Sequence, residues 1–186
     1  MDVSKVTIKN LLEAGIHFGH KTKRWNPKMQ NYIFGERNGI HIIDLQQTVI
    51  SFRNALEVIK KYSSQNKNIL FVGTKRQASE IISTSAIKCE QYYINNRWLG
   101  GMLTNWDTIQ NSIKRLKDLE VVLEEQSFTY TKNETLQFEK SVEKLNKALG
   151  GIKNMNGRPD LLFSIDTNRE VLAVKEAVKM GIPIIG

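Results

Sequence analysis

The segment 95–106 carries side chains that could bind a polyanion. It reads NNRWLGGMLTNW, so an arginine, two tryptophans and a Gly-Gly pair stand close together. The segment follows neither the strand period nor the helix period, and we interpret it as a shaped loop. Arg97 could bind a phosphate, and Trp98 could stack on a base. The alternative is that the aromatic rings are buried as a plug under a junction between elements.

A basic segment from Lys21 to Lys28 is a second candidate. Its cations flank Trp25, and Pro27 disfavours a regular element. Positive charge around an aromatic side chain is typical of contact with RNA or DNA. A solvated loop with no partner is the alternative interpretation.

The turn after the apolar run 69–72 could also meet a phosphate. That run predicts a buried central strand of a parallel sheet, and the residues from Gly73 to Arg76 lead into a helix. A strand, a glycine-containing turn and a helix present backbone N–H groups to an anion. The turn lacks the second glycine of a Walker loop, and a dinucleotide fingerprint is absent. It therefore predicts contact with a nucleic-acid backbone, whereas a small doubly wound enzyme that binds a nucleotide at Gly73 is the alternative.

Few residues suit catalysis. His17 and His20 could face a metal ion, but no carboxylate cluster stands nearby in the sequence. The sequence has no Gly-x-Ser-x-Gly elbow and no pairing of cysteine with histidine. Cys89 is alone and falls in an apolar helical pattern, so we expect it to be a buried small hydrophobe. We predict no enzymatic activity, no metal and no cofactor.

Composition points to the same class of partner. The 186 residues carry a formal net charge of +8, with 40% hydrophobic residues. This balance predicts a soluble protein with a polyanionic partner, nucleic acid first. No apolar run approaches the roughly 20 residues that cross a bilayer, so we expect no membrane contact. Many Ile, Asn and Lys residues hint at an AT-rich genome, such as that of an organelle.

Apolar spacing predicts the elements before residue 100. A short helix should end at Gly15, and a hairpin should turn at Asn38-Gly39 between strands 32–35 and 40–43. Asp44 should cap a helix whose apolar face runs from Val49 to Tyr62. A further strand is expected at residues 91–94.

Two long helices should follow from residue 107. Their apolar residues recur in steps of three and four, and Thr131 with Glu134 forms a capping box at the start of the second helix. We predict an antiparallel helical hairpin with coiled-coil-like packing. Lys114 and Arg115, near its base, could extend a positive surface.

The remaining pattern predicts an α/β sheet. Strand 161–165, a helix capped by Asp166 and strand 182–186 complete a doubly wound parallel sheet. We predict an α/β nucleic-acid-binding domain of residues 1–106 and 151–186, with an inserted helical hairpin of residues 107–150. The last strand, near Ile185, should be an exposed edge that a partner chain or an extension covers.

Ordered blocks across nearly the whole chain resemble the bacterial-type ribosomal protein S-two family of the small subunit. These blocks read LLEAGIHFGH at 11–20, RWNPKM at 24–29, YIFGERNGIHIIDL at 32–45, FVGTKRQA at 71–78, RWLGGMLTN at 97–105 and GIP at 181–183. Blocks of this length in this order are far more specific than a short motif.

The resemblance implies a flavodoxin-like parallel sheet with a helical hairpin, in a structural protein that is not an enzyme. It implies binding to small-subunit rRNA where the head meets the body, with other small-subunit proteins as neighbours. Family members usually continue beyond the last strand, and a shorter chain with AT-rich usage favours a mitochondrial, organelle-encoded version over a bacterial one. At matching positions, rRNA contact is expected of Lys21, Lys23, Arg24, Trp25, Asn26, Lys28, Arg37, Lys75, Arg76, Arg97, Trp98 and Asn105.

Overall fold

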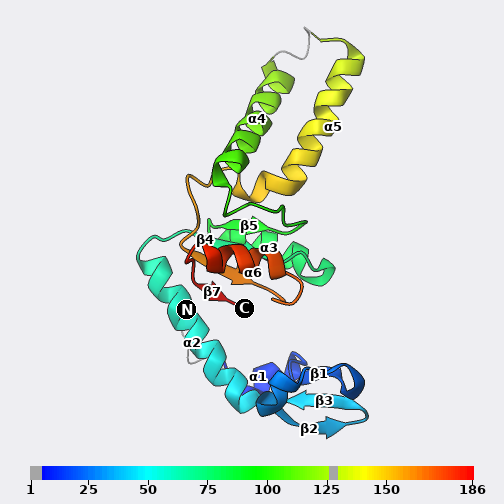
Figure 1. Ribbon diagram of the computed structural model, residues 1–186, viewed down its shortest axis with the longest axis vertical. Coiled ribbons are helices and arrows are strands. Elements are labelled where there is room, and N and C mark those ends of the chain that lie inside the picture. The colour runs from blue at the N-terminus through cyan, green and yellow to red at the C-terminus, as the bar shows by residue number, and fades with distance from the viewer. Residues whose placement is uncertain (1–5, 126–129) are drawn as a thin grey trace. The chain divides into compact units, whose positions relative to one another are not determined.

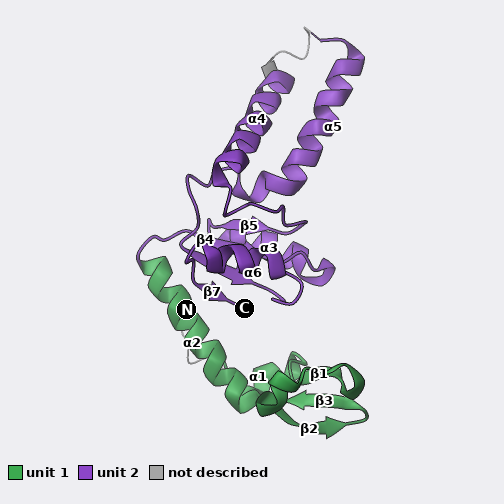
Figure 2. Cartoon of the chain, in the orientation of Figure 1, with its two compact units in different colours: residues 1–64 green, residues 65–186 purple. Residues whose placement is uncertain are grey.

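Two compact units make up the protein in the computed structural model, which describes residues 6–125 and 130–186. The first unit comprises residues 1–64 and the second residues 65–186 (Figure 2). Each has a sheet of its own: three antiparallel strands in the first unit and four parallel strands in the second.

The first unit is built on two helices. Helix α1 (Ile8–Glu13) is N-capped by Thr7. Gly15 follows its C-terminal end with a φ of +72°, the left-handed backbone conformation that glycine commonly adopts just after a helix. Helix α2 (Leu45–Ser64) packs on α1 through a small apolar cluster that includes Leu11 and Val49. The Asp44 carboxylate accepts a hydrogen bond from the Gln46 N–H at 2.9 Å, which confirms the predicted cap.

The sheet of the first unit contains β1 (Phe18–Lys21), β2 (Ile33–Arg37) and β3 (Ile40–Ile43), in the order β1-β3-β2. The predicted hairpin is confirmed: Asn38 and Gly39 have φ values of 54° and 72°, which suit a tight two-residue turn. Two short 3-10 helices, Thr22–Arg24 and Pro27–Tyr32, join β1 to β2. The basic segment is therefore irregular, as its Pro27 indicated.

The sheet of the second unit has the doubly wound order β5-β4-β6-β7 (Figure 1). Its strands are β4 (Ile69–Val72), β5 (Tyr92–Ile94), β6 (Leu161–Ser164) and β7 (Ile184–Ile185), and each pairing is parallel. The chain leaves β4 toward β5 on one side and returns to β6 on the other side. This reversal is the flavodoxin-like strand order, and it confirms the predicted fold class.

Helices α3 (Arg76–Lys88) and α6 (Val171–Lys179) connect neighbouring strands, whereas two longer helices occupy the crossover from β5 to β6. These two, α4 (Trp106–Glu125) and α5 (Lys132–Leu149), lie side by side (Figure 1). Thr131 and Glu134 form the predicted capping box. The coiled-coil-like packing, and a domain division at residues 107 and 150, stay predictions.

One apolar core unites the second unit. Leu70 and Val72 of the central strand contribute to it, and so do Ile113 of α4 and Leu149 of α5. The base of the two long helices is therefore fixed to the sheet by buried apolar contacts. In the described parts of the chain, no helix has the length and apolar content that crossing a membrane requires.

Two local predictions are wrong. Cys89 is exposed, because α3 ends at Lys88 and Cys89 is its C-cap, followed by Glu90 with a φ of 55°. Asp166 does not cap α6, which starts at Val171. Asp166 instead has a φ of 68°, and its carbonyl oxygen accepts from the Arg169 N–H at 2.9 Å, so a turn separates it from the helix.

Candidate nucleic-acid interface

A single carboxylate shapes the loop between β5 and α4. One oxygen of Glu176, on α6, accepts hydrogen bonds from the Trp98 indole N–H at 3.1 Å and the Gly101 N–H at 2.8 Å. The other oxygen accepts from the Leu103 N–H at 2.9 Å and from the N–H and hydroxyl of Thr104, both at 3.2 Å. The loop forms only turn hydrogen bonds within its own backbone, such as that from the Asn105 N–H to the Gly101 carbonyl oxygen, and Glu176 accepts from donors that these turns leave free.

These contacts set the protonation of Glu176. Partial burial favours the neutral carboxyl, but the hydrogen bonds from Leu103, Trp98, Gly101 and Thr104 outweigh it. The pKa of Glu176 therefore lies below its ordinary value, and the ionised form holds the loop.

The two tryptophans of the segment 95–106 are packing residues. Trp98 and Trp106 are each only 6% exposed, and both belong to the apolar core. The structure thus corrects the expectation that Trp98 offers a stacking face, because its ring is covered and its N–H is committed to Glu176. Arg97 is exposed, as is Asn105, whose side-chain oxygen accepts from the Thr108 hydroxyl at 3.0 Å.

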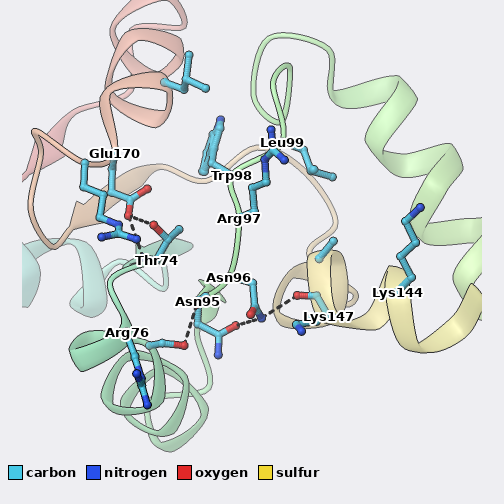
Figure 3. Close-up of a pocket in the computed structure, with 14 residues that line it drawn as sticks. Thr74, Arg76, Asn95, Asn96, Arg97, Trp98, Leu99, Lys144, Lys147 and Glu170 are labelled. Atoms are coloured by element: carbon cyan, nitrogen blue, oxygen red, sulfur yellow. Dashed lines mark hydrogen bonds between the residues drawn. The ribbon is translucent and has the colours of Figure 1, made fainter. Parts of the chain in front are cut away.

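A cleft of about 870 Å³ lies where β4, β5 and β6 end (Figure 3). The carboxyl ends of parallel strands meet there, beside the reversal in strand order, which is where open α/β sheets bind ligands. Thr74 follows β4, the segment from Asn95 to Leu99 follows β5, and Glu170 precedes α6. Five cations line this cleft: Arg76, Arg97, Lys144, Lys147 and Arg169.

The cleft is electropositive because five cations and only one carboxylate line it. Glu170 is 3% exposed and accepts from the N–H and hydroxyl of Thr74 at 2.8 and 2.6 Å (Figure 3). Among the described residues, none of the five cations forms a salt bridge. Five unneutralised cations around a concave surface are suited to hold phosphate groups.

The two cations of the turn after β4 differ in their surroundings. Lys75 forms an ion pair with Asp166 at 3.3 Å, whereas Arg76 lines the cleft. Gly73 brings this turn close to α3, because a Cβ at Gly73 would lie 2.9 Å from the Ile82 side chain. The turn therefore places Arg76 at the cleft and leaves Lys75 partly neutralised.

The basic residues of the first unit are exposed. Trp25 is 38% exposed, and its ring centroid lies 5.3 Å from that of His41. The other candidates there all have exposed side chains: Lys21, Lys23, Arg24, Asn26, Lys28 and Arg37. Lys114 and Arg115 are exposed on α4 of the second unit.

Sequence reasoning missed three of the five cleft cations. Lys144 and Lys147 lie three apart on the polar side of α5, where their charges resemble ordinary solubilising residues. Arg169 stands in the turn before α6, where the sequence pattern predicts the start of that helix. What could have identified these three cations is the topology, which brings each of them to the ends of the parallel strands.

The described residues offer little for metal chemistry. No group of three or more His, Cys, Asp or Glu side chains is gathered among residues 6–125 and 130–186 in a way that could hold a metal ion. The one carboxylate that lines the cleft, Glu170, is buried and accepts from Thr74, so the cleft cations suit anion binding better than proton transfer.

The comparisons with known proteins all point to one family. A model of the family described as ribosomal protein S2 matches residues 11–186. The small ribosomal subunit protein uS2 of Sinorhizobium medicae is 55% identical over 185 residues, which span 100% of this chain and 72% of that relative. Proteins of the same name from Rhizobium leguminosarum and Paramagnetospirillum magneticum are 56% and 54% identical, over 100% of this chain and 72% and 70% of theirs.

The fold and the cleft together define a class of protein: an α/β protein with a concave surface suited to bind a polyanion. The match in sequence is more specific, and the chain belongs to the ribosomal protein S2 family. That family is structural, which confirms the prediction that the chain is not an enzyme and leaves the nucleotide-binding alternative without support. The relatives named above are bacterial, so they do not support the mitochondrial location that composition favoured.

Proposed function

We propose that this protein is a structural constituent of the small ribosomal subunit that binds small-subunit rRNA at the junction of head and body. Family membership supports the ribosomal role, since relatives that match the whole chain are named small ribosomal subunit protein uS2. The observation that carries the RNA contact is the cleft of the second unit, whose five cations have no salt-bridge partner among the described residues.

Both units contribute to this proposed contact. In the first unit, the exposed cations around Trp25 are proposed to bind backbone phosphates while the indole packs on a base or a ribose. In the second unit, Arg76 and Arg97 are proposed to bind phosphates in the cleft, and the sequence-predicted Lys75, Asn105, Lys114 and Arg115 extend this surface. Trp98 contributes indirectly, because its packing helps to fix the loop that carries Arg97.

Binding of a small-subunit rRNA transcript at several salt concentrations tests the proposal. Arg76→Ala and Arg97→Ala should each weaken binding and lower the slope of log K against log salt by roughly 0.7 to 0.9 for each phosphate that the variant no longer binds. Lys140→Ala is the matched control, because Lys140 is exposed on α5 and does not line the cleft. Wild-type binding that does not depend on salt would contradict the proposal.

We also propose that a neighbouring small-subunit protein, a separate chain or a further segment covers β7. Its support is the position of β7 at the edge of the sheet, with Ile184 and Ile185 only half-buried. An unpaired strand edge is a template for further pairing. The Ile184 N–H points away from β6 in this parallel register. Amide exchange at Ile184 should be slower in the small subunit than in the free chain, and equal rates would rule the cover out.

A further inference from the structure

The small sheet of the first unit has an open face with two ordered rows of side chains. Residues that pair across strands point to the same side of a sheet, and so do residues two apart on one strand. Ile42 pairs with Phe18 and with Gly35, while Ile40 pairs with Lys21 and with Arg37. One face therefore carries an apolar row centred on Ile42 and a cationic row centred on Ile40.

The apolar row is unusually exposed for phenylalanine side chains. Phe18 is 60% exposed, and the His17 ring lies against it with ring centroids 4.0 Å apart. Phe34 is 81% exposed and is the extra, unpaired residue of the irregularity between Ile33 and Gly35, next to the Gly35 that pairs with Ile42. A Cβ at Gly35 would meet no heavy atom within 4 Å, so the space over the β2 end of the row is open.

The opposite face is already covered. His41 and Ile43 point to that side, and the Trp25 ring packs there with its centroid 5.3 Å from that of His41. The open face and the Trp25 ring thus lie on opposite sides of the small sheet.

We infer that the open face is a platform for unstacked bases of single-stranded RNA, with Phe18 and Phe34 as stacking rings and Lys21 and Arg37 on the flanking phosphates. Charge complementarity selects this occupant, because two exposed cations stand in the row beside the rings and the whole chain has a net charge of +8. Aromatic rings on a sheet stack on splayed bases, which an A-form duplex does not offer. The identity of the RNA as ribosomal rests on the proposed function.

Binding of the full chain to a short oligouridylate and to an A-form duplex of equal length tests the platform. The wild type should prefer the oligouridylate, and Phe18→Ala and Phe34→Ala should each weaken that binding about 5- to 100-fold at an unchanged salt slope. Lys21→Ala and Arg37→Ala should instead lower the slope by roughly 0.7 each.

Two conservative substitutions of Phe18 distinguish base stacking from burial of apolar area. Phe18→Trp should keep the affinity, and Phe18→Leu should weaken it as Phe18→Ala does, because leucine has no ring face. Wild-type affinity in Phe18→Leu would overturn the inference, as would equal binding of duplex and single strand by the wild type. If the wild type binds rRNA but not oligouridylate, the platform fails and the proposed function stands. If it binds neither, both fail.

Crosslinking can identify directly what contacts the open face in the assembled small subunit. A photo-crosslinking azidophenylalanine in place of Phe34 should form crosslinks to RNA in small subunits, because this side chain projects into solvent. Crosslinks only to a protein would identify a protein-docking face and overturn the inference.

Discussion

At the scale of single residues, Glu176 is the group that holds the candidate interface in shape. Glu176→Gln replaces one accepting oxygen with an NH₂ group, which then faces at least two donors of the loop. We expect the free energy of unfolding to fall by about 2 kcal/mol, because buried donors are left without their acceptor. Denaturant unfolding at neutral pH measures it, and the exposed Glu143→Gln on α5 is the control.

The same residue predicts a dependence on pH. The pKa of Glu176 is lower in the folded state than in the unfolded state, so its contribution is fully present above the unfolded value of about 4.3. It is lost as the pH falls through the lower, folded value. Between these values Glu176→Gln should lose stability less steeply than the wild type. Parallel acid unfolding curves for the two proteins would contradict this assignment.

Substitution of Trp98 distinguishes a role in core packing from a role in base stacking. Its side chain is 6% exposed within the core, so Trp98→Ala should cost about 3–5 kcal/mol of stability. Arg97→Ala, at an exposed neighbouring position, should change stability by less than about 0.5 kcal/mol and act on RNA binding alone. Thermal unfolding of both variants checks this. A stable Trp98→Ala protein with weakened RNA binding would restore the stacking interpretation.

The residue types indicated that cations could contact an anion, but they did not show the role of every candidate residue. A tryptophan beside an arginine suits both a base-stacking loop and a buried plug, and only the tertiary contacts with Glu176 decide between them. Likewise Lys75 and Arg76 are adjacent in sequence, yet one is paired with Asp166 and the other faces the cleft. Partners distant in sequence cannot be read from local pattern.

At the scale of elements, the close approach of the segment after α5 to β5 depends on glycine. A Cβ at Gly151 would collide with the Tyr93 carbonyl oxygen and ring, which belong to β5. Gly151→Ala should therefore destabilise the second unit by about 2–3 kcal/mol through a forced backbone shift. Gly157→Ala is the matched control, since its Cβ would meet nothing within 4 Å. Equal unfolding midpoints for the two variants would show that the contact yields easily.

Most elements could be predicted because their apolar period is strong. The central strand β4, the hairpin at Asn38-Gly39 and the capping box at Thr131 all follow from short local signals. The errors fall where tertiary contacts dominate. Asp166 has the residue type of a helix cap, but the turn before α6 places Glu170 at the cap position and directs its carboxylate to Thr74.

At the scale of the whole molecule, the net charge of +8 is distributed so that exposed cations are present in both units. Cations that lie far apart in the sequence meet at the cleft because a doubly wound sheet gathers its strand ends. The fold class was predictable from alternating strands and helices. The membership of the cleft was not, since Lys144 reaches it from the crossover between β5 and β6, and Arg169 from the turn between β6 and α6.

Sedimentation of native lysate tests the central claim most directly. If the protein is a structural constituent of the small subunit, it should sediment with that particle and leave it at high salt, as the phosphate contacts are screened. Its presence in fractions free of ribosomes at physiological salt, with none in the small-subunit peak, would contradict the account.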